Sequence, residues 1–164
     1  NYDVISIGNR YAKDYPFRTM IYSRLSKEPK LRFCMPLHPK MQMKGLDTSK
    51  YLIRERYAKF LSQSKIFIFG SSIYNYPLQK YTEGMASSCL VLAPKPHDAE
   101  ALHFIPDYNF VEINEHNFME KIEYYLENEG ERKKIVRNAN KTIKKYHTVE
   151  KRVKELISII KRCI

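Results

Sequence analysis

The chain has 164 residues, of which 43% are hydrophobic and 13% are aromatic, values typical of one folded domain and not of a disordered chain. Its net charge of +11 favours an anionic partner, although much of this charge lies on predicted helices of the last third. No apolar run approaches the ~20 residues that span a bilayer. The first residue is not Met, so we expect a fragment of a longer protein.

The three cysteines are odd in number and far apart, with no CxxC pair. Cys34 and Cys89 lie in apolar runs, where a free thiol acts as a small hydrophobic group. This pattern argues against a disulfide framework or a zinc cluster. It predicts a reducing compartment, and we expect a cytoplasmic location.

Strand and helix patterns alternate along the chain. Short apolar runs predict strands at 4–8, 31–36, 65–70, 89–94 and 109–113. Apolar residues at helical spacing predict helices at 15–27, 48–63 (with Thr48 as N-cap), 76–88, 97–105, 115–128, 131–147 and 148–161. Gly130 is expected to separate the helix at 115–128 from the next one.

Short apolar strands linked by helices predict an α/β fold. We expect a Rossmann-like open, mostly parallel sheet of about five strands, with helices on both faces and a helical C-terminus. The whole of 1–164 forms this single domain. Ligands of such folds bind outside the carboxyl ends of the strands, so the residues after the first, third and fourth strands are the candidates for a site.

A basic turn follows the first predicted strand. Gly8 permits a tight turn, and Arg10, Lys13 and Arg18 bring three cations to one crevice. The helix beginning near Pro16 adds free amide donors, which predicts an anion site; ordinary loop charge is the alternative. The pattern is not GxGxxG, so no dinucleotide fingerprint is present.

The third predicted strand is followed by a turn with small polar groups and then by a helix. Asn75 and Tyr76 precede that helix, on which Lys80 and Glu83 share one side. Taken alone, Lys80 and Glu83 could form only a local ion pair. The histidines show no spacing suited to a metal site, and we expect none.

The stretch KYTEGMASSCLVLA (80–93) resembles a segment in the C-terminal domain of GT-B glycosyltransferases: basic residue, aromatic residue, Glu, small residues and an apolar strand. The sequence at 104–153 is similar to the closing strand and helices of that domain, and 5–18 is similar to its opening strand and basic turn. The nearest group is the group-1-like family that includes the CgeB type. The resemblance covers nearly the whole chain.

The resemblance implies that this chain binds a nucleoside diphosphate sugar. The implied donor-binding residues are Glu83 for the ribose, Lys80, Arg10 and Arg18 for the diphosphate, and Asn75 and Tyr76 for the sugar or phosphate. Many relatives have a second Glu where this chain has Asn75. Their catalytic details are therefore not transferred, and the catalytic residues are left unassigned. The loop 36–47 is expected near the base.

The function implied by the resemblance is that of the donor half of a glycosyltransferase, which transfers a sugar to an acceptor hydroxyl without a metal or other cofactor. The N-terminal acceptor domain is absent, so we expect the chain alone to be inactive or weakly active. Expected partners are the nucleotide-sugar and that domain or the acceptor, with no specific nucleic acid; contact with an anionic membrane surface stays open. The alternative is a non-catalytic basic α/β module that binds nucleic acid or an acidic partner.

Overall fold

The computed structural model describes residues 2–9, 11–36 and 52–163, and it confirms the predicted Rossmann-like fold. Five parallel strands form one open sheet in the order β2-β1-β3-β4-β5. The strands are β1 (Tyr2–Ile5), β2 (Phe33–Cys34), β3 (Ser64–Ile68), β4 (Leu90–Ala93) and β5 (Val111–Glu112). Each lies within two residues of its predicted run.

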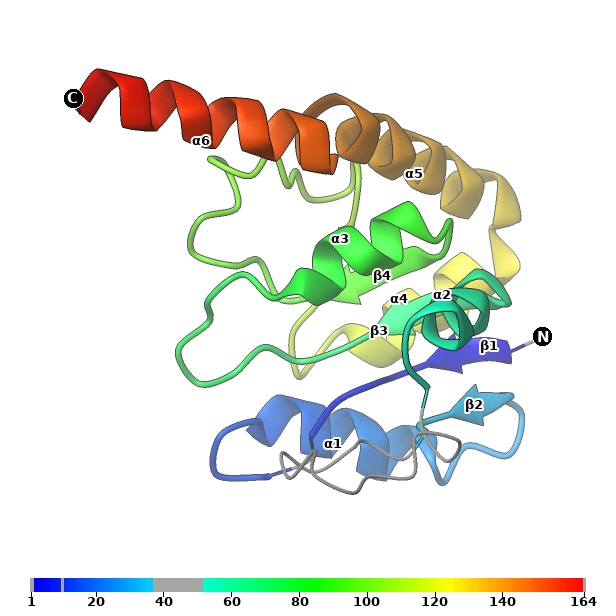
Figure 1. The fold of residues 1–164 in the computed structure, drawn as a ribbon. Helices are drawn as coiled ribbons and strands as arrows, with labels where there is room; N and C mark the ends of the chain where they lie inside the picture. Colours follow the sequence, from blue (N-terminus) through cyan, green and yellow to red (C-terminus); the bar gives the residue numbers. More distant parts are fainter. Residues whose placement is uncertain (1, 10, 37–51, 164) are drawn as a thin grey trace.

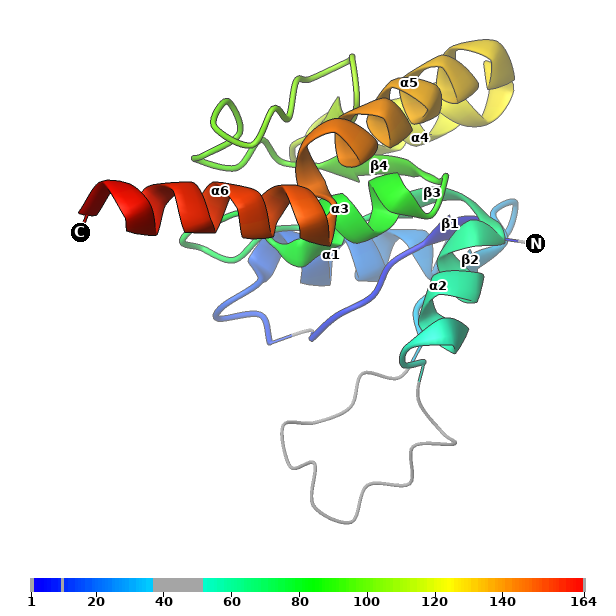
Figure 2. The ribbon, with the colours of Figure 1, turned by 45° about the horizontal axis from the view of Figure 1, so that its top comes forward.

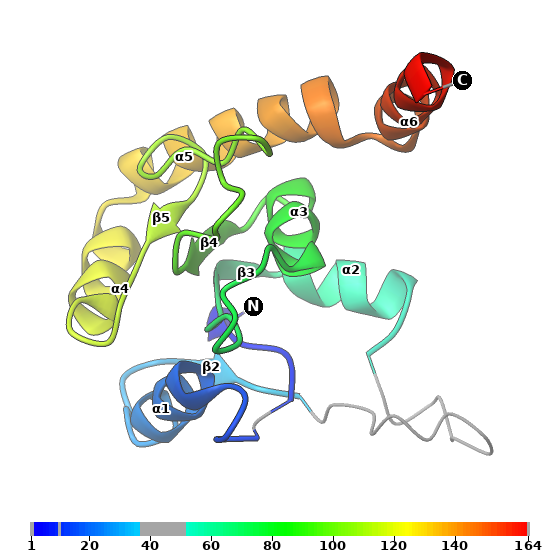
Figure 3. The same cartoon turned by 90° about the vertical axis from the view of Figure 1, so that its left-hand side faces the viewer.

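Helices cover both faces of the sheet. They are α1 (Pro16–Leu25), α2 (Glu55–Ser62), α3 (Gln79–Ala86), α4 (Phe118–Glu127) and α5 (Glu129–Thr142). A π-helical segment at Ile143–His147 then joins α5 to α6 (Val149–Cys163), which buries none of its residues. Figure 3 shows α1 and α4 on one side of the sheet and α2 and α3 on the other.

Side chains that alternate along the strands build two separate cores. Ile66 and Ile68 of β3 pack with the residues that face α1 and α4. Phe67 between them, and Phe69 just after the strand, pack on the other face with Tyr81 and with Met85 of α3. Because every residue of β4 is buried as well, the middle of the sheet is apolar on both faces, as expected for a covered parallel sheet.

The strand order places a crevice beside β1 and β3. The chain passes from β1 outward to β2 and then returns to form β3 on the other side of β1. A reversal of this kind is the topological switch point at which open α/β sheets bind ligands. The segments that leave β1 and β3, with Gly8 and Gly70, therefore start at this crevice.

Two sequence predictions are wrong in detail. Within the predicted helix 97–105, residues 97–103 form successive turns and no α-helix, and the turns end at His103, which adopts a left-handed φ of 55°. Gly130 does not separate two helices, because it lies in the first turn of α5 and the break falls at Asn128. Helix α2 begins at Glu55; the predicted cap at Thr48, and the loop 36–47 apart from its first residue, lie outside the described residues.

Helix α6 differs from the other helices because none of its residues is buried. It starts beside the end of α5 and extends over the side of the molecule on which the strands end, away from the sheet (Figures 1 and 2). The predicted apolar stripe of this helix is exposed, with Leu156 at 57% of its full accessible surface. Within the described residues, no helix is both long and apolar enough to cross a membrane.

Candidate functional site

A cavity of about 560 Å³ lies between α2 and α3 at the crevice. Its lining comes from four segments: Ile7 after β1, Pro36 after β2, residues 52–57 leading into and along α2, and residues 76–83 leading into and along α3. The first three segments are mainly apolar but include Arg54, and α3 contributes Lys80 and Glu83. One cavity therefore contains an apolar wall, two cations and a carboxylate.

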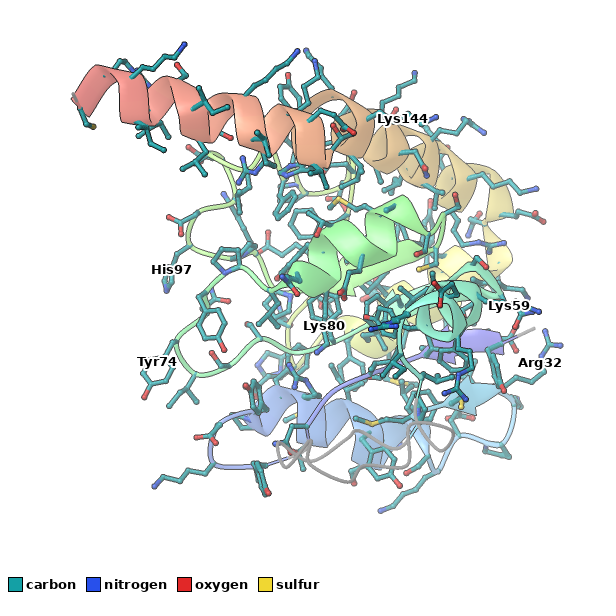
Figure 4. All side chains as sticks on the ribbon, viewed as in Figure 1. Arg32, Lys59, Tyr74, Lys80, His97 and Lys144 are labelled. Carbon is teal, nitrogen blue, oxygen red and sulfur yellow. The ribbon has the colours of Figure 1, made fainter. Side chains whose placement is uncertain are left out.

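Two cations meet at Gly8 on one side of this cavity. Gly8 has a φ of +137°, and a Cβ atom built there would lie 2.8 Å from both Arg18 Nη1 and Lys80 Nζ. A side chain at this position would displace one or both charged groups. Figure 4 shows Lys80 extending from α3 toward α1, the helix that carries Arg18. The two elements thus bring their cations together across the end of β1.

The electrostatics of this pair are unfavourable without a ligand. Burial and the nearby charge of Arg18 lower the pKa of Lys80 from 10.5 to about 8, against the opposing effect of Glu83. Burial also lowers the pKa of Arg18. Lys80 and Glu83 form no ion pair in the part of the chain described here, so the local pair considered from the sequence is absent.

Arg18 lies behind Lys80 and holds two loops. It is only 2% exposed, its Nη1 donates to the carbonyl of Asn9 at 3.0 Å, and its Nη2 donates to the carbonyl of Gly70 at 2.8 Å. Its guanidinium also stacks on the ring of Tyr15, 4.1 Å from the centroid. The Nε group is buried and has no hydrogen-bond partner among the described residues. Arg18 therefore contributes its charge to the site from beneath the surface.

Glu83 lines the same cavity one helical turn after Lys80 on α3. Its Oε2 accepts a hydrogen bond of 2.7 Å from the hydroxyl of Tyr57 on α2. Burial and the adjacent carboxylate both raise the pKa of Tyr57, so its hydroxyl stays a donor. In the described residues, no other side chain donates to the Glu83 carboxylate.

Asn75 and Tyr76 belong to the loop that leads into α3. Asn75 has a φ of 47°; its Oδ1 accepts from Ser71, and its Nδ2 donates to the carbonyl of Lys95. Its side chain thus links the loops that follow β3 and β4. Tyr76 is 44% exposed, lines the cavity and lies beside Tyr15, whose pKa it raises.

The structure brings most of the sequence-predicted residues to one crevice. Lys80, Glu83 and Tyr76 line the cavity, Arg18 lies behind Lys80, and Asn75 lies in the adjoining loop, with its side chain engaged by other protein groups. Arg10, also predicted for the diphosphate, lies outside the described residues.

Sequence reasoning missed Tyr57, which lies within the helix predicted at 48–63. The tyrosine is 26 residues away from Glu83 in the sequence. No local spacing connects them, and only the packing of α2 against α3 brings them together.

The described residues contain no group of three His, Cys, Asp or Glu side chains that could hold a metal ion. The polar groups of the site are instead three cations (Arg54, Lys80 and, behind it, Arg18), one carboxylate, the amide of Gln79 and tyrosine side chains. Cations and hydroxyl groups suit an anionic ligand, and a carboxylate suits hydroxyl donors. A ligand with an anionic part and a polyhydroxylated part would complement both the cations and the carboxylate.

Comparison with known proteins agrees with this description. A family model described as "Glycosyl transferase-like" matches residues 16–158. No curated protein sequence matches the chain. Among solved structures, the C-terminal domain of the group 1 family glycosyl transferase LpcC from Francisella tularensis superposes with a TM-score of 0.61 at 16% identity, covering 90% of this chain and 87% of that one.

Two further solved structures have the same fold. A glycosyltransferase from Rickettsia africae gives a TM-score of 0.72 at 18% identity, with 99% of this chain and 48% of that chain covered. The Anabaena protein HepE, solved in complex with UDP-glucose, gives 0.63 at 15% identity, with 88% and 44% covered. This chain thus corresponds to less than half of these two proteins and to most of the LpcC domain. The predicted likeness to a group 1 glycosyltransferase C-terminal domain is confirmed; the narrower CgeB-type assignment stays a prediction.

Proposed function

The chain belongs to the glycosyl transferase-like family, and from this premise we propose that it binds a nucleoside diphosphate sugar as the donor half of a glycosyltransferase. The reaction would transfer the sugar from the nucleoside diphosphate to an acceptor hydroxyl. The ligand would lie in the cavity between α2 and α3, with its nucleoside near α2 and its diphosphate near Gly8.

The observation that carries the proposal is the pair of cations at Gly8. Lys80 and Arg18 converge there from two helices, and burial together with the charge of Arg18 lowers the pKa of Lys80. A diphosphate would neutralise this pair and relieve the repulsion. During transfer, the same charges would stabilise the negative charge that develops on the departing nucleoside diphosphate. Arg10, predicted for the same role, stays a proposal based on the sequence.

Glu83 is the proposed ligand of the ribose. A carboxylate accepts hydrogen bonds from adjacent hydroxyls, which suits the cis-diol of a ribose. The apolar surface of Ile7, Leu52 and Ile53 in the same cavity supports a position for the base beside it. Burial of a flat base against such side chains would add hydrophobic stabilisation.

Tyr76 and Asn75 are proposed on the sugar or phosphate side. The hydroxyl of Tyr76 belongs to the cavity wall, which supports a direct contact with the donor. Asn75 already bonds to Ser71 and Lys95, which supports an indirect role in holding the loop. Neither brings a carboxylate, so catalytic residues stay unassigned, and the chain alone is proposed to transfer slowly or not at all. No metal or other cofactor enters this proposal.

Three further parts of the proposal concern a second domain, a membrane surface and the location of the protein. A second domain is proposed to supply the acceptor site, because the chain covers less than half of the Rickettsia and Anabaena proteins. The exposed apolar and basic residues of α6 support a contact with an anionic membrane surface. A cytoplasmic location fits the free cysteines.

A thermal-shift screen with UDP, GDP and their sugars tests the donor proposal. We expect at least one of them to raise the melting temperature of the chain and to lose this effect in Glu83→Ala. Glu123→Ala, which removes an exposed carboxylate of α4, is the matched control and should respond like the parent. Salt-sensitive binding to random nucleic acid, without any response to the nucleotides, would instead support the alternative of a basic nucleic-acid-binding module.

A further inference from the structure

We infer that Tyr57 is a positioning residue that fixes the orientation of the Glu83 carboxylate and thereby makes the site selective for ribose over deoxyribose. This inference rests on the proposed function, since it assigns a ribose to Glu83. The contact itself is direct: the Tyr57 hydroxyl donates to Glu83 Oε2 at 2.7 Å, and both residues line the same cavity.

The surroundings make this hydrogen bond persistent. Tyr57 is partly buried, and it packs against the core beneath α2 with its ring. A donor to a charged carboxylate forms a stronger hydrogen bond than one to a neutral acceptor. Burial and the adjacent Glu83 raise the pKa of Tyr57, so its hydroxyl keeps the proton that it donates.

A hydrogen bond that fixes Oε2 of Glu83 also affects how the carboxylate binds a ligand. A free glutamate on a helix samples several rotamers, and a ligand must restrict them when it binds. With Oε2 held from α2, the carboxylate is already oriented, and its unused lone pairs remain for ribose hydroxyls. Loss of a ribose hydroxyl then leaves the oriented acceptor unpaired, which is the physical origin of selectivity.

Tyr57→Phe separates the positioning of the Glu83 carboxylate from the packing of the Tyr57 ring. It keeps the ring that contacts the core and removes only the hydroxyl that reaches Glu83. Tyr125→Phe is the matched control, because Tyr125 is a buried tyrosine on α4, on the other face of the sheet. Its loss of a hydroxyl should alter stability without altering nucleotide selectivity.

The test is calorimetric titration of the full chain with UDP or GDP, whichever binds, and with the 2′-deoxy and 3′-deoxy forms of that nucleotide. We expect Tyr57→Phe to weaken binding of the ribonucleotide by about 5- to 10-fold, which is within the usual net effect of one hydrogen bond. Binding of at least one deoxy form should change by less than about twofold, so that the selectivity falls. In Glu83→Gln the added Tyr57→Phe change should have little further effect.

The possible outcomes separate the two proposals. If the parent chain binds none of the nucleotides, the donor function and the role of Tyr57 are both overturned. If the parent prefers ribose in a way that depends on Glu83, and Tyr57→Phe weakens binding of all three ligands equally, Tyr57 contributes only to the shape of the cavity. The positioning role is then overturned and the donor function is not. Tighter ribonucleotide binding by Tyr57→Phe would show that Tyr57 competes with the ribose, which also overturns the inference.

Discussion

Two charged clusters lie at opposite ends of β1 and β3, and their charges are paired in different ways. At the amino ends, Asp3 is 8% exposed and forms ion pairs with Arg32 at 3.0 Å and with Lys65 at 2.8 Å. The hydrogen bond from Arg32, followed by that from Lys65, holds the pKa of Asp3 well below its usual value. Every charge in this cluster therefore has an opposite partner.

At the carboxyl ends, Arg18 and Lys80 meet as like charges beside Gly8. Burial and then the charge of Arg18 lower the pKa of Lys80, whereas an ion pair would raise it. Burying unpaired charge costs folding stability, whereas the Asp3 cluster contributes stability. The difference indicates that the amino-end cluster serves the fold and that the carboxyl-end cluster serves a ligand.

The largest expected effect comes from filling the space between the two cations. Gly8→Ala places a Cβ atom 2.8 Å from both charged groups, at a φ of +137° that alanine rarely adopts. We expect nucleotide affinity to fall by at least about tenfold, and the free energy of unfolding to fall by about 1–3 kcal/mol. Calorimetric titration and urea denaturation measure the two effects.

Gly130→Ala is the matched control, because a Cβ atom there would have nothing within 4 Å. Gly130 lies in the first turn of α5, so alanine should leave affinity unchanged and raise the free energy of unfolding by up to ~1 kcal/mol. Unchanged nucleotide affinity in a folded Gly8→Ala chain would contradict the assignment of the diphosphate to this crevice.

Breaking the ion pairs of Asp3 should change the stability of the fold and leave nucleotide binding unchanged. Asp3→Asn removes the acid that pairs with Arg32 and Lys65, and we expect a loss of about 1–3 kcal/mol at pH 7, with nucleotide affinity unchanged. Because Arg32 is 60% exposed and Lys65 41%, solvent screening favours the lower part of this range.

The pH dependence of the same variant has a definite sign. The folded-state pKa of Asp3 lies below the unfolded value of 3.8, so the carboxylate stabilises the fold above pH 3.8. This stability is lost as the pH falls from there toward the folded-state pKa. Urea denaturation of the parent and of Asp3→Asn should therefore converge in strong acid, and a constant difference between them would contradict the pairing.

Much of the fold could be predicted from the sequence because its central strands are apolar on both faces. Runs such as Leu90–Ala93 have no amphipathic alternative, and the helices between them show regular spacing. The backbone of 97–105 could not be predicted, because the apolar residues that suggested a helix are buried in the core without a helix between them. Ala99 and Phe104 are buried in the core, while the backbone between them makes separate turns.

The candidate site could be predicted in part, because the fold class fixes where the strand ends lie. A parallel sheet brings the ends of neighbouring strands together, so Lys80 and Glu83 on one helix side already pointed to the crevice. The hydrogen bond from Tyr57 and the position of Arg18 beneath Lys80 depend on the packing between helices and loops distant in sequence. Neither has a local sequence signal.

Removing the charge of Lys80, which lies beside the like charge of Arg18, should stabilise the fold and weaken nucleotide binding. Lys80→Met keeps an unbranched side chain that is shorter by one heavy atom and removes the charge. We expect the free energy of unfolding at pH 7 to rise by about 1 kcal/mol, and nucleotide affinity to fall by about tenfold. Lys59→Met, at an exposed lysine of α2 (Figure 4), is the control and should change neither by much. A strongly destabilised Lys80→Met chain would show that Lys80 is paired after all.

The smallest effect is the pH dependence that Lys80 alone contributes to stability. Its folded-state pKa of about 8 lies below the unfolded value of 10.5, so the unfolded chain binds more protons between these limits. The parent should therefore gain stability relative to Lys80→Met as the pH rises from 8 to 10, by about 1 kcal/mol after allowance for partial solvation.

Other buried groups act in the opposite direction over the same range. Burial raises the pKa of Cys89 to about 12 and also raises that of Tyr81, so their ionisation destabilises the fold in alkali. Both groups are present in the parent and in Lys80→Met, and the difference between the two urea-denaturation series cancels their contribution. Parallel series from pH 8 to 10 would mean that Lys80 keeps an ordinary pKa, and the contrast with the Asp3 cluster would then rest on geometry alone.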